Sequence, residues 1–117
     1  MVLIAYAKCS TCQKAEKWLR DKGFAFTVRP IKTQPPAAEE LSAWQEKSGL
    51  PLKKFFNTSG AVYRDRKLKD ELPGMSRQEM LELLAGDGML VKRPILLDGD
   101  KVLLGFHEDE WEKALGV

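Results

Sequence analysis

The chain has 117 residues, of which 44% are hydrophobic and 31% charged, and its 19 basic and 17 acidic residues leave a formal net charge of +2. This length suits one domain with a hydrophobic core. The nearly balanced charge argues against direct nucleic-acid binding by bulk electrostatics. The apolar runs are too short for a membrane span, and no signal peptide is visible. We therefore expect a cytoplasmic protein that does not bind membranes.

The N-terminal quarter predicts a strand, a helix and a second strand. Residues 2–6 are a short apolar run, typical of a buried strand. Residues 10–22 place their apolar side chains on one side of a helix, and Gly23 follows as a candidate C-cap. Residues 24–28 are rich in aromatic and β-branched side chains, which favours a strand. This order predicts a right-handed βαβ unit with parallel strands.

The middle of the chain predicts helices and a loop. Two consecutive prolines, Pro35 and Pro36, can open a helix that ends near Gly49. Residues 50–56 predict a second, short helix, and residues 57–65 predict a loop.

The last third of the chain opens with a helix and returns to strands. The sequence Ser-Arg-Gln-Glu beginning at Ser76 is a capping box, and the helix that it starts ends at Gly86. Residues 95–97 and 102–104 are apolar and flank an Asp-Gly-Asp turn, which indicates an antiparallel hairpin. Residues 108–115 predict a final helix.

The order of the predicted elements is βαβ, a helical insert at about 35–88, and ββα. A parallel strand pair joined to an antiparallel hairpin predicts an α/β fold of the thioredoxin-like type, with a four-stranded mixed sheet flanked by helices. We expect residues 1–117 to form a single domain.

Two cysteines stand where the first strand gives way to the first helix, in the stretch YAKCSTCQKAEKWL. Cys9 lies just before the helix, whose free N–H groups and positive dipole end favour a thiolate. Lys8 and Lys14 would add to this effect if they turn inward, and together these groups would bring the pKa of Cys9 below its free value of about 8.5. Cys12 lies one turn into the helix on its core-facing side. We therefore expect Cys9 to attack a substrate and Cys12 to resolve the adduct as an internal disulfide.

Other interpretations of the pair are a zinc site and two inert buried thiols. A structural zinc site needs four ligands, whereas the chain has one cysteine pair and a single histidine, His107. We therefore expect no metal, and no Gly-rich phosphate loop indicates a flavin or nucleotide cofactor either. Inert cysteines remain an alternative, because cysteine often packs as a small apolar residue.

A second candidate motif is Arg93-Pro94 in the stretch VKRPILL. Pro94 opens a predicted strand, where its missing N–H costs least. Arg93 can bind an anion through its guanidinium group, although a solvated surface charge is the alternative. His107 begins a helix and has no identifiable partner for acid–base chemistry.

The segments YAKCSTCQKAEKWL, KRPILL and GFHEDEW together resemble the ArsC/Spx family, the arsenate-reductase-like branch of the thioredoxin superfamily. The resemblance covers nearly the whole chain and is greatest to CxxC-containing, reductase-like members of the Spx/MgsR type. It implies a thioredoxin-like fold with an all-helical insert. It also implies that Pro94 is a cis proline facing the nucleophile, Cys9.

The resemblance also implies an anion site. The glutaredoxin-linked arsenate reductases hold their oxyanion with three arginines, and Arg93 matches the one before the cis proline. Asn57 and His107 occupy the other two positions, and those reductases lack a cysteine at the place of Cys12. Loss of two charge-assisted contacts predicts weak arsenate reduction. A phosphate-like anion is expected to meet Arg93, Pro94 and the helix start at Ser10 and Thr11.

Two functions follow from the resemblance. The first is a thiol–disulfide oxidoreductase that acts on arsenate or another small oxidised substrate, with thioredoxin or glutaredoxin as the reductant. The second is an Spx-type redox-sensing transcriptional regulator that binds the C-terminal domain of the RNA polymerase α subunit.

Overall fold

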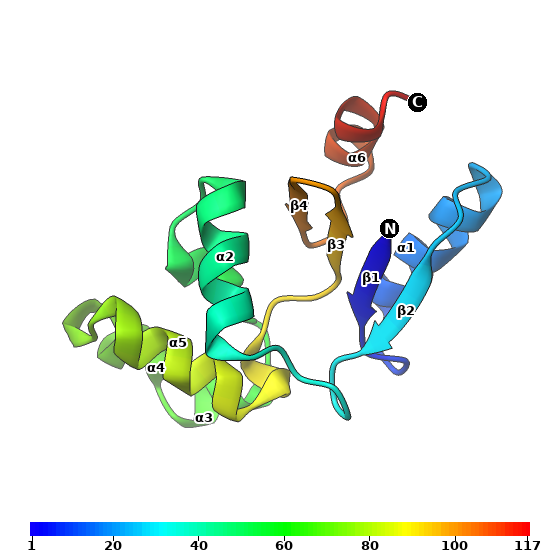
Figure 1. Cartoon of the computed structure of the whole chain (residues 1–117). Helices are drawn as coiled ribbons and strands as arrows, with labels where there is room; N and C mark the ends of the chain where they lie inside the picture. The colour runs from blue at the N-terminus through cyan, green and yellow to red at the C-terminus, as the bar shows by residue number, and fades with distance from the viewer. The chain divides into compact units, whose positions relative to one another are not determined.

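The computed structural model describes all residues, 1–117, and places them in two compact units (Figure 1). The first, called here the sheet unit, consists of Met1–Pro30 and Arg93–Val117. The second, the helical unit, is Ile31–Lys92. None of the helices is both long enough and apolar enough to cross a lipid bilayer.

The sheet unit contains a four-stranded mixed sheet with the strand order β2-β1-β3-β4. Its strands are β1 (Val2–Ala5), β2 (Thr27–Pro30), β3 (Ile95–Asp98) and β4 (Lys101–Leu104). β1 runs parallel to β2 and antiparallel to β3, and β3 and β4 form an antiparallel hairpin. The parallel pair, the hairpin and the mixed sheet are confirmed.

Two helices of the sheet unit, α1 (Ser10–Asp21) and α6 (Glu108–Leu115), pack on the same face of this sheet. Because side chains alternate along a strand, β1 directs Leu3 to this face, and Leu96 lies opposite it on β3. Trp18 of α1 and Trp111 of α6 meet edge to face over them, with ring centroids 5.9 Å apart. This aromatic core packs α1 against the sheet.

The end of α1 is a Schellman motif centred on Gly23. Gly23 adopts φ +82°, a conformation that favours glycine, and its N–H donates to the carbonyl of Arg20. The N–H of Phe24 donates to the carbonyl of Leu19, and the Phe24 ring stacks on Trp18. The predicted helix stop is confirmed, and it turns the chain back toward β2.

The helical unit is built from short helices around its own core of buried side chains. They are α2 (Ala38–Ser48), η1 (Leu52–Phe55), α3 (Ala61–Asp65), α4 (Leu68–Glu71), η2 (Leu72–Gly74), α5 (Arg77–Gly86) and η3 (Gly88–Leu90). The predicted capping box is confirmed at the start of α5, where the N–H of Glu79 donates to Oγ of Ser76 and the N–H of Ser76 donates to Oε1 of Glu79. Gly49 ends α2 in the left-handed conformation, as expected.

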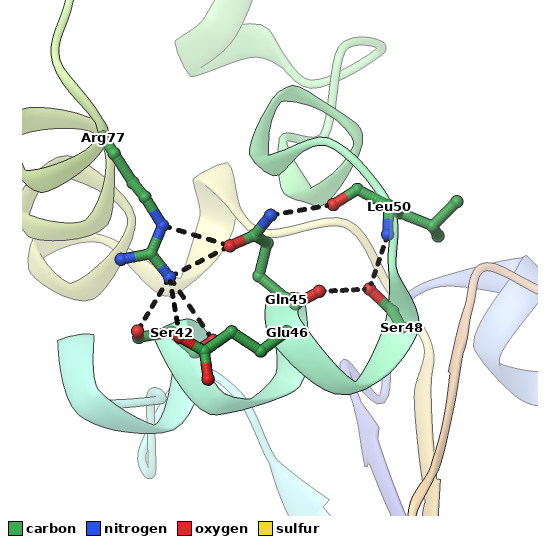
Figure 2. Close-up of polar contacts among 6 residues, drawn as sticks. All are labelled: Ser42, Gln45, Glu46, Ser48, Leu50 and Arg77. Carbon is green, nitrogen blue, oxygen red and sulfur yellow. Dashed lines mark hydrogen bonds and ion pairs between the residues drawn. The ribbon is translucent and has the colours of Figure 1, made fainter.

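Arg77, the first residue of α5, binds the side of α2 (Figure 2). Its Nε and Nη2 donate to Oε1 of Gln45 at 3.1 and 2.9 Å, and Nη2 also donates to Oγ of Ser42 at 2.8 Å. Glu46 lies 4.0 Å away as an ion-pair partner. A planar guanidinium group can make such paired contacts, whereas an ammonium group cannot. Arg77 therefore joins the two longest helices of this unit.

Replacing Arg77 by alanine is expected to lower the free energy of unfolding by about 1 kcal/mol, because the lost hydrogen bonds are partly exposed to water. Arg77→Lys keeps the positive charge and serves as the control; it should recover less than half of the loss, because it cannot bond Gln45 through two nitrogens. Urea denaturation followed by circular dichroism measures both variants. Wild-type stability in Arg77→Ala would contradict the role of these contacts.

Two predicted boundaries were wrong. α2 begins at Ala38 and not at the prolines: Pro36 disfavours a helical backbone at Pro35, and Ala37 is the extended N-cap residue (φ −77°, ψ 161°). β2 begins at Thr27 and not at residue 24, because Phe24 and Phe26 pack in the aromatic core before the backbone reaches β1. The N–H of Thr27 then donates to the carbonyl of Met1.

The predicted loop at residues 57–65 was also wrong, because its second half forms α3. The N–H of Gly60 donates to the carbonyl of Asn57 and turns the chain into the helix. Tyr63 is buried there, with its ring 6.4 Å from the ring of Phe56. A five-residue helix is not stable alone, and burial of this tyrosine supplies the stabilisation that its local sequence does not indicate.

Candidate functional site

Cys9 is the N-cap residue of α1, at the end of the turn that leaves β1. Its backbone is extended (φ −89°, ψ 120°), and its carbonyl accepts the first bond of the helix from the N–H of Gln13 at 3.0 Å. The side chain of Gln13 donates to the carbonyl of Ala7 at 2.8 Å. The N–H of Cys9 donates to the carbonyl of Tyr6 at 3.0 Å. These bonds fix the turn and place the sulfur at the start of the helix, as predicted.

The environment of Cys9 favours the thiolate. Its partial burial raises the pKa, but several groups that lower the pKa outweigh this effect. They are the backbone N–H and thiol of Cys12 and the backbone N–H of Thr11, which donate hydrogen bonds to the sulfur, and the positive charge of Arg93. The net result is a pKa below the ordinary value of a cysteine. Lys8 and Lys14 are exposed and are not among the groups that lower it, so the contribution expected of them is absent.

Cys12 has the opposite character. It lies in the core between α1 and the sheet with 1% of its surface exposed. Its pKa is raised to about 12, mainly by burial and also by the hydrogen bond and negative charge of Cys9. The N–H of Tyr6 and the charge of Arg93 act in the opposite direction. Both cysteines are free thiols in the structure. The pair therefore consists of one sulfur prepared to ionise and one held protonated.

This difference predicts the pH dependence of alkylation by iodoacetamide. The Cys9 rate should rise with pH and level off once the thiolate is fully formed, with its inflection below that of a free cysteine measured under the same conditions. Cys12 should stay unmodified in the native protein up to about pH 10, because its pKa is raised and it is buried. Peptide mapping by mass spectrometry distinguishes the two sites. An inflection at or above that of a free cysteine, or preferential labelling of Cys12, would contradict the description of the pair.

Arg93 is far from the two cysteines in the sequence, but its charge acts on both of them. The Arg93-Pro94 peptide bond is cis, as the resemblance implies. The carbonyl of the buried Pro94 accepts the N–H of Gly105 at 2.8 Å, which anchors the segment before β3. The guanidinium carbon of Arg93 lies 5.3 Å from the centre of the Tyr6 ring. Its charge acts on both Cys9 and Cys12, so Arg93 belongs to the same site.

The remaining candidate residues differ in their relation to this site. Ser10 and Thr11 form the exposed first turn of α1, and the backbone of Thr11 contacts the Cys9 sulfur. His107 is the exposed N-cap residue of α6 and is not among the groups that shift the pKa of Cys9. Asn57 belongs to the helical unit, where its N–H donates to the carbonyl of Leu90 at 2.7 Å. No group of three or more His, Cys, Asp or Glu side chains is arranged to hold a metal ion.

Tyr6 is a residue that the sequence did not single out. It ends the apolar run of the first strand, which predicted only a structural role for it. The signal that could have found it is an aromatic residue three positions before the first cysteine of a CxxC motif, where the chain turns into the helix.

The sheet order, the cis proline and a cysteine pair at the start of the first helix define a thioredoxin-like α/β protein with a two-cysteine site. A model of the ArsC family matches residues 5–114, and the chain belongs to this family.

Three similar proteins illustrate the range of the family. The uncharacterized protein YusI of Bacillus subtilis (strain 168) is 57% identical over 108 residues, covering 92% of each chain. The global transcriptional regulator Spx of Enterococcus faecalis is 30% identical over 115 residues, covering 98% of this chain and 86% of the regulator. The crystal structure of a possible arsenate reductase from Streptococcus mutans UA159 superposes with a TM-score of 0.86 at 44% identity, covering 95% of this chain and 96% of the other.

Proposed function

We propose that the protein is a thiol–disulfide oxidoreductase in which Cys9 is the nucleophile and Cys12 the resolving thiol. The observation that carries this proposal is the opposite protonation preference of two neighbouring sulfurs, with the pKa of Cys9 lowered and that of Cys12 raised to about 12. Two inert buried cysteines would not need this difference. Perturbed pairs of this kind are concentrated at reactive sites.

The first step is attack by the Cys9 thiolate. On a disulfide substrate, the sulfur of Cys9 forms a bond to one substrate sulfur while the other leaves as a thiolate. On arsenate, Cys9 forms a sulfur–arsenic bond and one arsenate hydroxyl group takes up a proton from the solvent and leaves as water, with arsenic still in its +5 state. Because the charge of Arg93 acts at the Cys9 sulfur, it favours anionic substrates over neutral ones.

The second step is resolution by Cys12. Its sulfur loses its proton and attacks Cys9, so that a Cys9–Cys12 disulfide forms. The substrate sulfur leaves as a thiolate and takes up the Cys12 proton, or arsenic leaves as arsenite with the bonding electron pair and that proton. Burial keeps the pKa of Cys12 high throughout, but the contributions from the Cys9 charge and hydrogen bond disappear once Cys9 carries the substrate. The first step therefore prepares Cys12 for the second.

A dithiol reductant then restores both cysteines, and we propose thioredoxin or glutaredoxin for this role. The test follows NADPH consumption with each reductant system, using arsenate and hydroxyethyl disulfide as substrates. We expect turnover of the disulfide with at least one system and slower turnover of arsenate, since Asn57 and His107 stand where the resemblance implies arginines. Absence of turnover under every combination, with no Cys9–Cys12 disulfide after mild oxidation, would reject the proposal.

A second function, redox-dependent regulation of transcription, is favoured by the similarity to the regulator Spx, which extends over 98% of this chain. In this proposal the Cys9–Cys12 disulfide changes the affinity for the RNA polymerase α subunit. A pull-down with the α C-terminal domain, run on reduced and oxidised protein, tests it. Binding in neither state would remove this function and leave the enzymatic one standing.

Two further predictions stay open. We propose that residues 1–117 act as one functional domain, with the helical unit inserted in the thioredoxin-like sheet unit. We also propose a cytoplasmic location, where thioredoxin or glutaredoxin would keep the cysteine pair reduced.

A further inference from the structure

Tyr6 contacts all three groups of the candidate site through different atoms. Its carbonyl accepts the N–H of Cys9 at 3.0 Å, and its own N–H donates to the sulfur of Cys12. The face of its ring lies against the guanidinium group of Arg93, at 5.3 Å from the ring centre. Its backbone contacts would survive most substitutions, whereas the ring contact depends on the identity of the side chain.

The ring contact limits where the Arg93 charge can lie. The backbone of Arg93 is held by the neighbouring Pro94, whose carbonyl is hydrogen-bonded to Gly105. Its side chain, however, has several rotatable bonds. A cation within about 6 Å of an aromatic face is attracted to it. Because electrostatic effects fall with distance, the influence of Arg93 on Cys9 depends on this orientation.

We propose that Tyr6 is a positioning residue whose ring holds the Arg93 guanidinium group toward the Cys9 sulfur, so that the site favours thiolate formation and the entry of anionic reagents. Arg93 and Cys12 are the titratable side chains that act on Cys9. Tyr6 is not itself among the groups that shift the pKa of Cys9. In this proposal it acts only through Arg93. The inference deepens the proposed function, because it assumes that Cys9 is the attacking sulfur.

The test compares Tyr6→Leu with Tyr6→Phe by alkylation kinetics. Iodoacetamide, a neutral reagent, reports the pH inflection of Cys9, and iodoacetate, an anionic reagent, reports the local positive charge. In Tyr6→Leu we expect the inflection to move to higher pH, the rate at pH 7 to fall about threefold, and the ratio of the iodoacetate to the iodoacetamide rate to fall also. Tyr6→Phe keeps the ring face and should behave like the wild type.

The same measurements in an Arg93→Met background separate positioning from a general structural effect. If Tyr6 acts through Arg93, Tyr6→Leu should change neither the inflection nor the rate ratio once Arg93 is absent. An unchanged inflection and ratio in Tyr6→Leu would overturn the inference, as would equal changes with and without Arg93. Because alkylation needs no turnover, the outcome of this test can be distinguished from a failure of the proposed function in the NADPH and oxidation assays.

Discussion

If the protein has the proposed oxidoreductase activity, Cys9→Ser is expected to lower its turnover by about 10³-fold or more, the largest effect of any single substitution in this chain. A serine hydroxyl stays protonated at neutral pH, so the α1 N-terminus and the Arg93 charge can no longer provide an anionic nucleophile. The substitution is nearly isosteric and the N-cap position tolerates serine, so the fold should be retained. The NADPH assay measures turnover, and circular dichroism verifies folding.

Cys12→Ser is the matched control for the same pair. It leaves the proposed nucleophile in place but removes the proposed resolving thiol, so a stable mixed disulfide between Cys9 and the substrate should accumulate. Intact-mass spectrometry detects this adduct as an added substrate mass, whereas Cys9→Ser should show none. If Cys9→Ser kept wild-type turnover, or if Cys12 and not Cys9 carried the adduct, the roles assigned to the two sulfurs would be wrong.

Trp111→Ala is expected to lower the free energy of unfolding by about 3–5 kcal/mol. Trp111 is fully buried in the aromatic core, with its ring centre 4.9 Å from that of Phe106 and 5.9 Å from that of Trp18. Its indole N–H donates to the carbonyl of Gly105 at 3.0 Å. The substitution therefore creates a large cavity and also leaves a buried carbonyl without a donor.

Trp111→Phe separates these two causes, because it keeps an aromatic ring and removes the hydrogen bond. We expect it to cost about 1–3 kcal/mol. Urea denaturation monitored by near-ultraviolet circular dichroism measures both variants. Because Cys12 lies in the same cluster, Trp111→Ala should also make this thiol accessible to iodoacetamide. A destabilisation below about 1 kcal/mol in Trp111→Ala would show that the core does not depend on this residue.

Much of the fold could be predicted because its signals are local. The Asp-Gly-Asp turn, the glycine that ends α1 and the capping box at Ser76 each depend on residues a few positions apart, and each is confirmed. The errors occurred where packing between distant residues decides the structure. α3 forms around the buried Tyr63, and β2 begins late because Phe24 and Phe26 pack in the core.

At the candidate site, too, local features could be predicted from the sequence, whereas long-range ones could not. The order of elements and the CxxC spacing determined that Cys9 precedes α1 and that Cys12 lies on its buried side, because helical periodicity is a property of the local chain. Only the tertiary structure decided which charges reach the two sulfurs. Arg93 is 84 positions from Cys9 in the chain, and β1 and β3 are adjacent strands, so the fold brings its charge to the pair while Lys8 and Lys14 remain exposed. Electrostatic effects depend on distance through space, which sequence separation does not reveal.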